Sequence, residues 1–195
     1  MTINWFYIEL GINHVLDYNA LDHLYFLVVL TAPFNLKTIK KLIILVTFFT
    51  LGHTFSLILS FFYSIPINSI WIEFLIPITI AFTCLPLIFY SNKTISSNYY
   101  DLIISLTTII FGIIHGLGFA SFFSKIIIDD ASIYNLLEFA IGIEFSQVII
   151  ALIVVLFKET ALKFLGFSDK KLQFTLGFFI FLLSLKMIYN NQPFF

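Results

Sequence analysis

The sequence predicts an all-α fold, a polytopic bundle of about six transmembrane helices that forms a single domain over residues 1–195. Hydrophobic residues make up 60% of the chain and charged residues 11%, whereas a soluble domain carries about a quarter charged residues. The mean hydropathy of +1.03 is too high for a soluble fold, so lipid must solvate most of the surface. Apolar runs of about 20 residues, enough for a helix to cross the hydrocarbon core, alternate with short polar turns.

Residues 1–17 are expected to form a short interfacial segment, because Trp5 and Tyr7 have the amphipathic rings that favour the headgroup level. No basic region or small-residue cleavage site marks a signal peptide, so this start is interpreted as mature sequence. The fully apolar part of the first span is short, because Asp22 and His23 stand near its start. Alternatively, residues 3–15 complete this span. Six helices are expected within residues 18–190, at 18–35, 41–63, 69–90, 101–124, 134–157 and 172–190.

The lysines predict the orientation, since the sequence contains no arginine. Lys125 and Lys186 belong to one side of the membrane, and the other lysines belong to the opposite side, which the positive-inside rule makes cytoplasmic. The protein is therefore expected to be a multi-pass protein of the cell inner membrane with both termini outside, in the periplasm. The cytoplasmic lysines are Lys37, Lys40, Lys41, Lys93, Lys158, Lys163, Lys170 and Lys171.

The charge balance also bears on partners. A net charge of −1 gives no reason to expect a nucleic acid. The lipid bilayer and a metal ion are the expected partners, and a homo-oligomer or a membrane complex stays open.

Ionisable side chains are expected to gather in the outer half of the membrane. The first, third and fifth spans start outside, and the second and fourth carry a histidine near mid-depth. A charge at the bilayer centre costs about 2.5–3.5 kcal/mol on insertion scales, so such groups need a partner, a wet cavity or an ion. The residues concerned are His14, Asp17, Asp22, His23, His53, Glu73, His115, Glu138, Glu144 and Gln147.

Imidazole with carboxylate is a donor set that suits divalent transition metals such as Ni, Co or Zn. The alternative is that each histidine only forms a hydrogen bond between helices. We expect a metal site whose ligands are His14, Asp22, His23, His53, His115 and Glu144. Asp17, Glu73, Glu138 and Gln147 are expected to support it.

Small residues predict close helix packing beside this site. Gly112 and Gly116 form a GxxxG pair on either side of His115, and such pairs let helix backbones approach closely. Gly142 has a similar role in the fifth span. This packing leads to the hypothesis that His115 and Glu144 lie near one another.

At these motifs the sequence resembles the HupE/UreJ family of small membrane proteins, which are proposed nickel or cobalt permeases. The family's His-x5-Asp-His spacing is here two residues longer, from His14 to Asp22 and His23, as in a variant branch. The matching blocks are Gly11–His14, Leu21–Phe26, Thr50–Ser56, Glu73, His115–Ser121 and Gly142–Gln147.

Three functions are therefore compatible with the sequence. The first, which the resemblance implies, is a permease that captures a divalent cation on the outer side. The second is an intramembrane metal-dependent hydrolase, in which histidines hold Zn with an open position for water and Glu144 is the general base. The third is a non-catalytic membrane subunit whose polar cluster locks the bundle.

Overall fold

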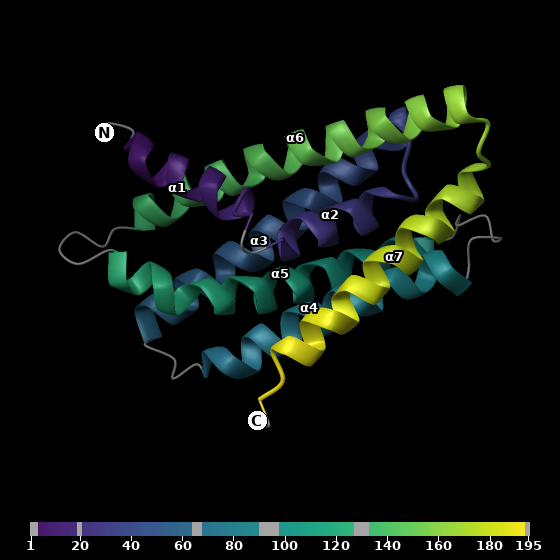
Figure 1. Cartoon of the computed structure of the whole chain (residues 1–195). Coiled ribbons are helices and arrows are strands. Elements are labelled where there is room, and N and C mark those ends of the chain that lie inside the picture. Colours follow the sequence, from purple (N-terminus) through teal and green to yellow (C-terminus); the bar gives the residue numbers. More distant parts are fainter. Residues whose placement is uncertain (1–3, 19–20, 64–67, 90–97, 127–132, 194–195) are drawn as a thin grey trace.

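The computed structural model is an all-helical bundle in residues 4–18, 21–63, 68–89, 98–126 and 133–193, which are the residues it describes (Figure 1). Long antiparallel helices form the body of the bundle, and two short helices, α1 and α2, follow one another beside it. The helices are α1 (Trp5–Val15), α2 (Asp22–Thr31), the 3₁₀ turn η1 (Leu36–Thr38), α3 (Ile39–Tyr63), α4 (Ser69–Phe89), α5 (Asn98–Ile126), α6 (Ile133–Leu165) and α7 (Asp169–Asn190).

Five of the predicted spans are confirmed as long apolar helices. In the described residues, five helical segments have the length and composition to cross a membrane: Leu36–Tyr63, Ser69–Phe89, Leu102–Ala120, Ile133–Phe164 and Asp169–Asn190. The fifth predicted span, 134–157, ends before the helix does, because a polar residue such as Lys158 does not stop a helix. The helix ends at Leu165, before Gly166, whose φ of 65° is a left-handed conformation that suits glycine.

The first predicted span, 18–35, is not one continuous helix. α1 has 11 residues and α2 has 10, so each covers about half of a hydrocarbon core about 30 Å thick. Both contact α6, and together they have the length of one crossing, as in the alternative in which residues 3–15 complete the first span. The placement of residues 1–17 at a membrane interface stays a prediction.

Glycines bring the backbones of α3 and α5 into direct contact. A Cβ atom on Gly112 would lie 2.2 Å from the carbonyl oxygen of Phe49, and one on Gly52 would lie 2.3 Å from that of Ile109. A Cβ on Gly116 would similarly meet the carbonyl oxygen of His53 at 2.3 Å. The predicted close packing around the GxxxG pair is therefore confirmed, and it sets the position of the α3 segment that carries His53.

Glycines also bring the backbones of α1 and α6 into direct contact. A Cβ on Gly11 would lie 2.2 Å from the carbonyl oxygen of Phe139, and one on Gly142 would lie 2.1 Å from that of Ile8. The packing role predicted for Gly142 is confirmed, and its neighbour is α1.

The two ends of the chain lie at the same end of the bundle. The backbone N–H of Asn4 donates to Oε1 of Glu138, near the start of α6, at 2.9 Å. The side-chain amide of Asn191 donates to the carbonyl oxygen of Glu73, near the start of α4, at 3.0 Å. The opposite end holds η1 and the start of α7, and we call it the η1 end (Figure 1). Which end faces the cytoplasm stays a prediction from the lysines.

At the η1 end, a buried lysine connects three elements. Lys158 on α6 is 2% exposed, and its ammonium donates to the carbonyl oxygens of Ala32 at 2.7 Å and Phe34 at 2.9 Å. It also pairs with Asp169, the first residue of α7, at 2.8 Å. Carbonyls past a helix end have no partner in the helix, so a cation there supplies what they lack.

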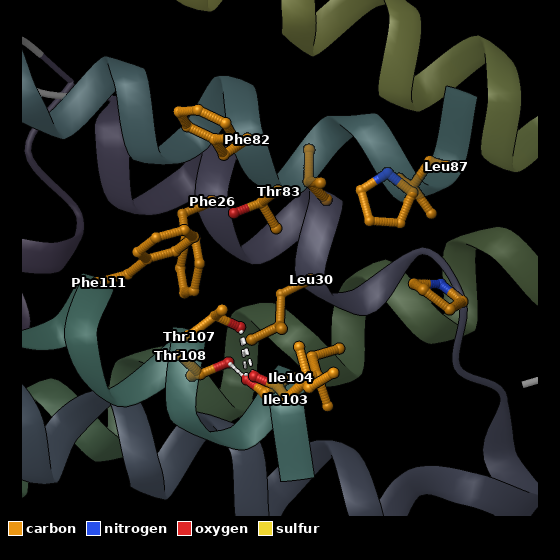
Figure 2. Close-up of a pocket in the computed structure, with 13 residues that line it drawn as sticks. Phe26, Leu30, Phe82, Thr83, Leu87, Ile103, Ile104, Thr107, Thr108 and Phe111 are labelled. Carbon is orange, nitrogen blue, oxygen red and sulfur yellow. Dashed lines mark hydrogen bonds between the residues drawn. The ribbon is translucent and has the colours of Figure 1, made fainter. Parts of the chain in front are cut away.

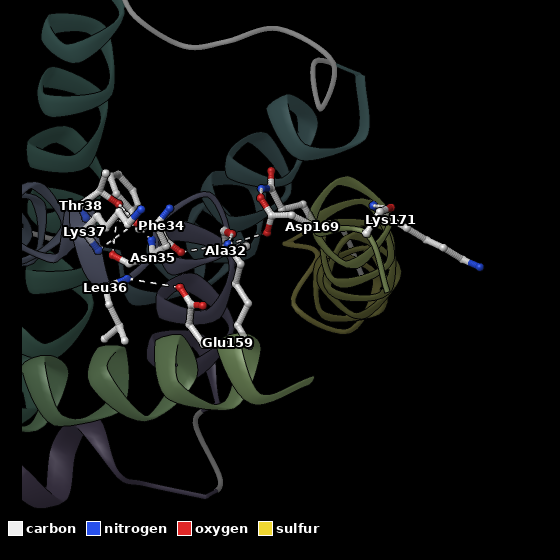
Figure 3. Close-up of polar contacts among 12 residues, drawn as sticks. Ala32, Phe34, Asn35, Leu36, Lys37, Thr38, Glu159, Asp169 and Lys171 are labelled. Atoms are coloured by element: carbon white, nitrogen blue, oxygen red, sulfur yellow. Dashed lines mark hydrogen bonds and ion pairs between the residues drawn. The ribbon is translucent and has the colours of Figure 1, made fainter. Parts of the chain in front are cut away.

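The turn between α2 and α3 has its own cap beside this lysine (Figure 3). The Asn35 side chain accepts hydrogen bonds from the N–H groups of Lys37 and Thr38, and the Thr38 hydroxyl accepts one from the Asn35 N–H. The N–H of Leu36 points to the Glu159 carboxylate at 3.5 Å. These contacts fix where α2 ends and α3 begins.

Replacing Gly112 by Ala should destabilise the bundle by about 1–3 kcal/mol, because the new methyl group collides with backbone rather than with a flexible side chain. Thermal unfolding in detergent measures this change. Gly118→Ala is the matched control on the same helix, since its methyl group meets only the side-chain ends of Ile76 and Ile72, at 3.1 and 3.3 Å. Equal melting temperatures for the two variants would contradict the role assigned to the backbone contact.

Lys158→Met should lower the stability by about 2 kcal/mol, because two carbonyl groups lose a charged donor. The control is Lys163→Met, five residues further along α6, because Lys163 is exposed. Thermal unfolding again gives the comparison. A loss no larger than that of the control would show that the buried ammonium does not hold α2, α6 and α7 together.

Candidate metal centre

Four histidines from four helices converge inside the bundle. They are His14 on α1, His23 on α2, His53 on α3 and His115 on α5. The ring of His23 lies 4.7 Å from that of His14, 6.0 Å from that of His53 and 5.3 Å from that of His115, centre to centre. His23, His53 and His115 are each at most 2% exposed. We call these four residues the histidine cluster.

The ring nitrogens of the cluster are placed as metal ligands would be. His14, His23 and His53 each offer one nitrogen, and these three atoms lie within 4.8 Å of one another. Nε2 of all four histidines, and Nδ1 of His53 as well, are buried without a hydrogen-bond partner. Burying an unpartnered polar atom is costly, and a bound cation would give these nitrogens the partner they lack. The residues therefore fit a metal ion.

Two of the histidines are oriented by a second contact. Nδ1 of His115 lies 2.8 Å from the carbonyl oxygen of Phe111, which can only accept, so Nδ1 carries the proton and Nε2 keeps a free lone pair. Nδ1 of His23 lies 3.3 Å from Oδ1 of Asp22, which also accepts from the His23 backbone N–H. A carboxylate or carbonyl behind a ligating imidazole fixes its tautomer and raises its basicity. Asp22 thus lies behind His23.

The break between α1 and α2 is what brings His14 and His23 together. His14 is in the last turn of α1, and His23 is in the first turn of α2. Asp22 begins α2, where the positive end of the helix dipole favours a carboxylate. A continuous helix would separate His14 and His23 by about 13 Å along its axis.

Phenylalanine rings surround the cluster. Phe119 lies 4.0 Å from the ring of His14 and stacks on Phe139 at 5.0 Å, while Phe49 lies 5.0 Å from the ring of His115. Phe26 stacks on Phe49 at 4.7 Å. Such an apolar wall lowers the local dielectric constant and strengthens every electrostatic interaction inside it.

Glu144 lies apart from the metal-ligand group that the described residues form. Its carboxylate accepts hydrogen bonds from Thr47 at 2.6 Å and from Thr50, and the Thr50 hydroxyl also contacts Oε1 of Gln147 at 3.0 Å. His115 instead packs against Phe49 and His23, so the contacts support no pairing of His115 with Glu144.

The other expected supporting residues also lie outside this group. Glu138 accepts from Asn4, and its second oxygen is buried without a partner. Asp17 and Glu73 are exposed. Of the ten residues expected at one site, the structure gathers the four histidines and Asp22.

The threonines that hold Glu144 were missed from the sequence. Thr47 and Thr50 are three residues apart and so share a helix face, which was a usable signal. The phenylalanine wall carried no such signal, because the chain has 26 Phe and most of them face elsewhere.

A cavity of about 340 Å³ lies between α2, α4 and α5, on the η1 side of the cluster. Phe26 and Phe111 line it, with ring centres 6.2 Å apart, and Phe26 also lies 5.9 Å from the ring of His115 (Figure 2). The hydroxyls of Thr83 and Thr108 reach its wall but donate to carbonyls of their own helices. Phe26 therefore stands between this cavity and the histidines.

A family model described as HupE / UreJ protein matches residues 2–190, nearly the whole chain. The chain belongs to the HupE/UreJ family. The match includes all four histidines and Asp22, so the resemblance seen in the sequence blocks is confirmed. The comparisons with curated proteins and with solved structures give no match.

His53→Ala should abolish the binding of Ni²⁺, because His53 offers one of the three nitrogens that lie within reach of one ion. Asp22→Asn should weaken it about 10- to 100-fold, the usual effect of removing the group behind a ligating histidine. Isothermal titration of the purified protein in detergent gives both values. Thr83→Ala is the control, since the Thr83 hydroxyl bonds to Thr79 of its own helix. Unchanged binding in His53→Ala would refute the site.

Proposed function

We propose that this HupE/UreJ protein is a permease for a divalent transition metal ion, with nickel or cobalt as the expected cargo. The observation that carries the proposal is the set of four imidazoles whose Nε2 atoms are buried and unpartnered, drawn from four helices of an apolar bundle. Imidazole ligands suit Ni, Co and Zn, whereas Mg and Ca prefer oxygen. Membership of the family supports a cargo of this kind.

The broken first crossing favours transport. Transporters commonly place their substrate site where a transmembrane helix is interrupted, near the middle of the membrane. Here the interruption lies between α1 and α2, and it carries His14, Asp22 and His23. The ligands sit on two short helices that can shift relative to one another without unwinding a long one.

A route beyond the cluster is needed for release, and the cavity beside Phe26 supplies space for one. It extends from Phe26 on α2 to Pro33, just after that helix, and is lined on α4 by Phe82 and Pro86. Phe26 lines the cavity and also contacts His115, so a rotation of its ring would open part of the wall between them. Phe26 is accordingly the proposed gate on this side.

The hydrolase alternative gains less from the geometry. It requires a general base beside the metal-bound water, and Glu144, the expected base, is instead held by Thr47 and Thr50. The alternative of a non-catalytic subunit leaves the unpartnered nitrogens of the cluster without a role.

Uptake of radiolabelled Ni²⁺ into proteoliposomes tests the proposal. The wild type should accumulate the ion with time, excess Co²⁺ should compete and Mg²⁺ should not, and His23→Ala should lower the rate at least tenfold. Thr160→Ala is the control, since the exposed Thr160 hydroxyl bonds to Leu156 of its own helix. Tight Ni²⁺ binding without uptake would favour the hydrolase. A well-folded protein that binds no metal would leave only the non-catalytic subunit.

A further inference from the structure

A second polar group lies between α3 and α6, apart from the histidine cluster. Its members are Thr47 and Thr50 on α3 and Glu144 and Gln147 on α6. Thr50 precedes His53 by three residues, so the group lies about 4.5 Å further along α3 toward the η1 end. Thr50 is 7% exposed and Gln147 is fully buried, which places polar atoms inside an apolar bundle.

The group is rich in acceptors and poor in protons. The Thr47 hydroxyl lies 2.6 Å from Oε1 of Glu144 and 3.1 Å from the carbonyl oxygen of Ile43. The Thr50 hydroxyl faces Oε2 of Glu144, Oε1 of Gln147 at 3.0 Å and the carbonyl oxygen of Val46 at 3.3 Å. Each hydroxyl has one proton to donate, so five acceptor contacts share two protons.

The two hydroxyls therefore have two arrangements. In one, both protons point to Glu144, as in a carboxylate held by two donors. In the other, each proton points to the carbonyl four residues back, a bond that Thr side chains in helices commonly form. The second arrangement turns lone pairs of both hydroxyl oxygens toward Glu144 and Gln147. In that arrangement five oxygen atoms offer lone pairs to one point, and a cation would bind there by moving the hydroxyls apart from Glu144, to which Thr47 now lies at a hydrogen-bond distance of 2.6 Å.

The charge and the burial of this group also favour a monovalent cation. Glu144 carries the only carboxylate of the group, and no lysine or histidine nitrogen is paired with it in the described part of the chain. The fully buried Gln147 turns its Oε1 to Thr50, and its Nε2, which can only donate, takes no part in holding a cation. One positive charge would neutralise the carboxylate, whereas a divalent ion would leave a net charge in an apolar setting, which is costly.

We propose that Thr47, Thr50, Glu144 and Gln147 form a second cation site, which binds a small monovalent hard cation, Na⁺. Its donors are all oxygens, the ligands that hard cations prefer, whereas the histidine cluster offers nitrogens to softer metals. The ion would connect α3 to α6 one turn away from His53. The proposal does not depend on metal transport by the cluster.

Binding of ²²Na⁺ to the purified protein in sodium-free detergent buffer tests this site. The wild type should bind one Na⁺ per chain, with choline unable to compete and K⁺ competing weakly. Glu144→Gln keeps the shape of the side chain but removes its charge, and should weaken binding at least tenfold. Thr50→Val, which removes one oxygen and little volume, should also weaken it severalfold.

Two variants serve as matched controls. Glu159→Gln removes a carboxylate from the same helix, and Thr107→Val removes a hydroxyl that bonds to carbonyls of α5. Both should bind Na⁺ as the wild type does, and gel filtration shows whether each variant is folded.

Three results would overturn the proposal. The first is a folded wild type that binds no Na⁺. The second is Na⁺ binding that neither Glu144→Gln nor Thr50→Val weakens. The third is the uptake of one proton, lost in Glu144→Gln, in place of Na⁺, which would make the group a proton site. The first result needs no variant, so a folding defect in either variant leaves the proposal testable.

Discussion

The backbone contact between α3 and α5 is the constraint on which the rest of the structure depends. Gly52, Gly112 and Gly116 let two helices meet carbonyl to Cα, so His53 and His115 are carried by helices that have almost no freedom to separate. The pair α1 and α2 is attached to the other helices by different contacts: α1 packs on α6 through Gly11 and Gly142, and α2 contacts α4 and α6. The four histidines are therefore carried by two glycine-packed helix pairs and by the short helix α2.

The polar interior is arranged in steps along the bundle rather than in one place. Nitrogen ligands form the first step, the oxygen group around Glu144 lies about one helical turn away, and the ammonium of Lys158 lies at the η1 end. Each step is bordered by α6. The histidine cluster offers nitrogen ligands and the group around Glu144 offers oxygen ligands, so the two groups suit different ions. The helix that they share is a physical basis for influence between the proposed metal site and the proposed Na⁺ site.

The sequence was sufficient for most of the fold and for part of the site. Composition and run length predicted six spans, and five of them are long apolar helices in the described residues. The histidines indicated the centre, because an ionisable side chain within lipid needs a partner, a wet cavity or an ion. A boundary near residue 17 was predicted, and α1 ends at Val15. That the span 18–35 contains an α-helix of only 10 residues was not predicted, since hydropathy alone does not fix where a helix begins. Thr47 and Thr50 were not recognised as neighbours of Glu144, because sequence gives the depth of a residue better than the helix face it contacts.

Lys158 has a consequence for the order in which the bundle assembles. It is one of the lysines on which the predicted orientation depends, and in the folded bundle its ammonium is buried. Its carboxylate partner, Asp169, is synthesised eleven residues later, at the start of α7. A chain in which α7 has not docked therefore retains a buried cation without its carboxylate where α2 ends.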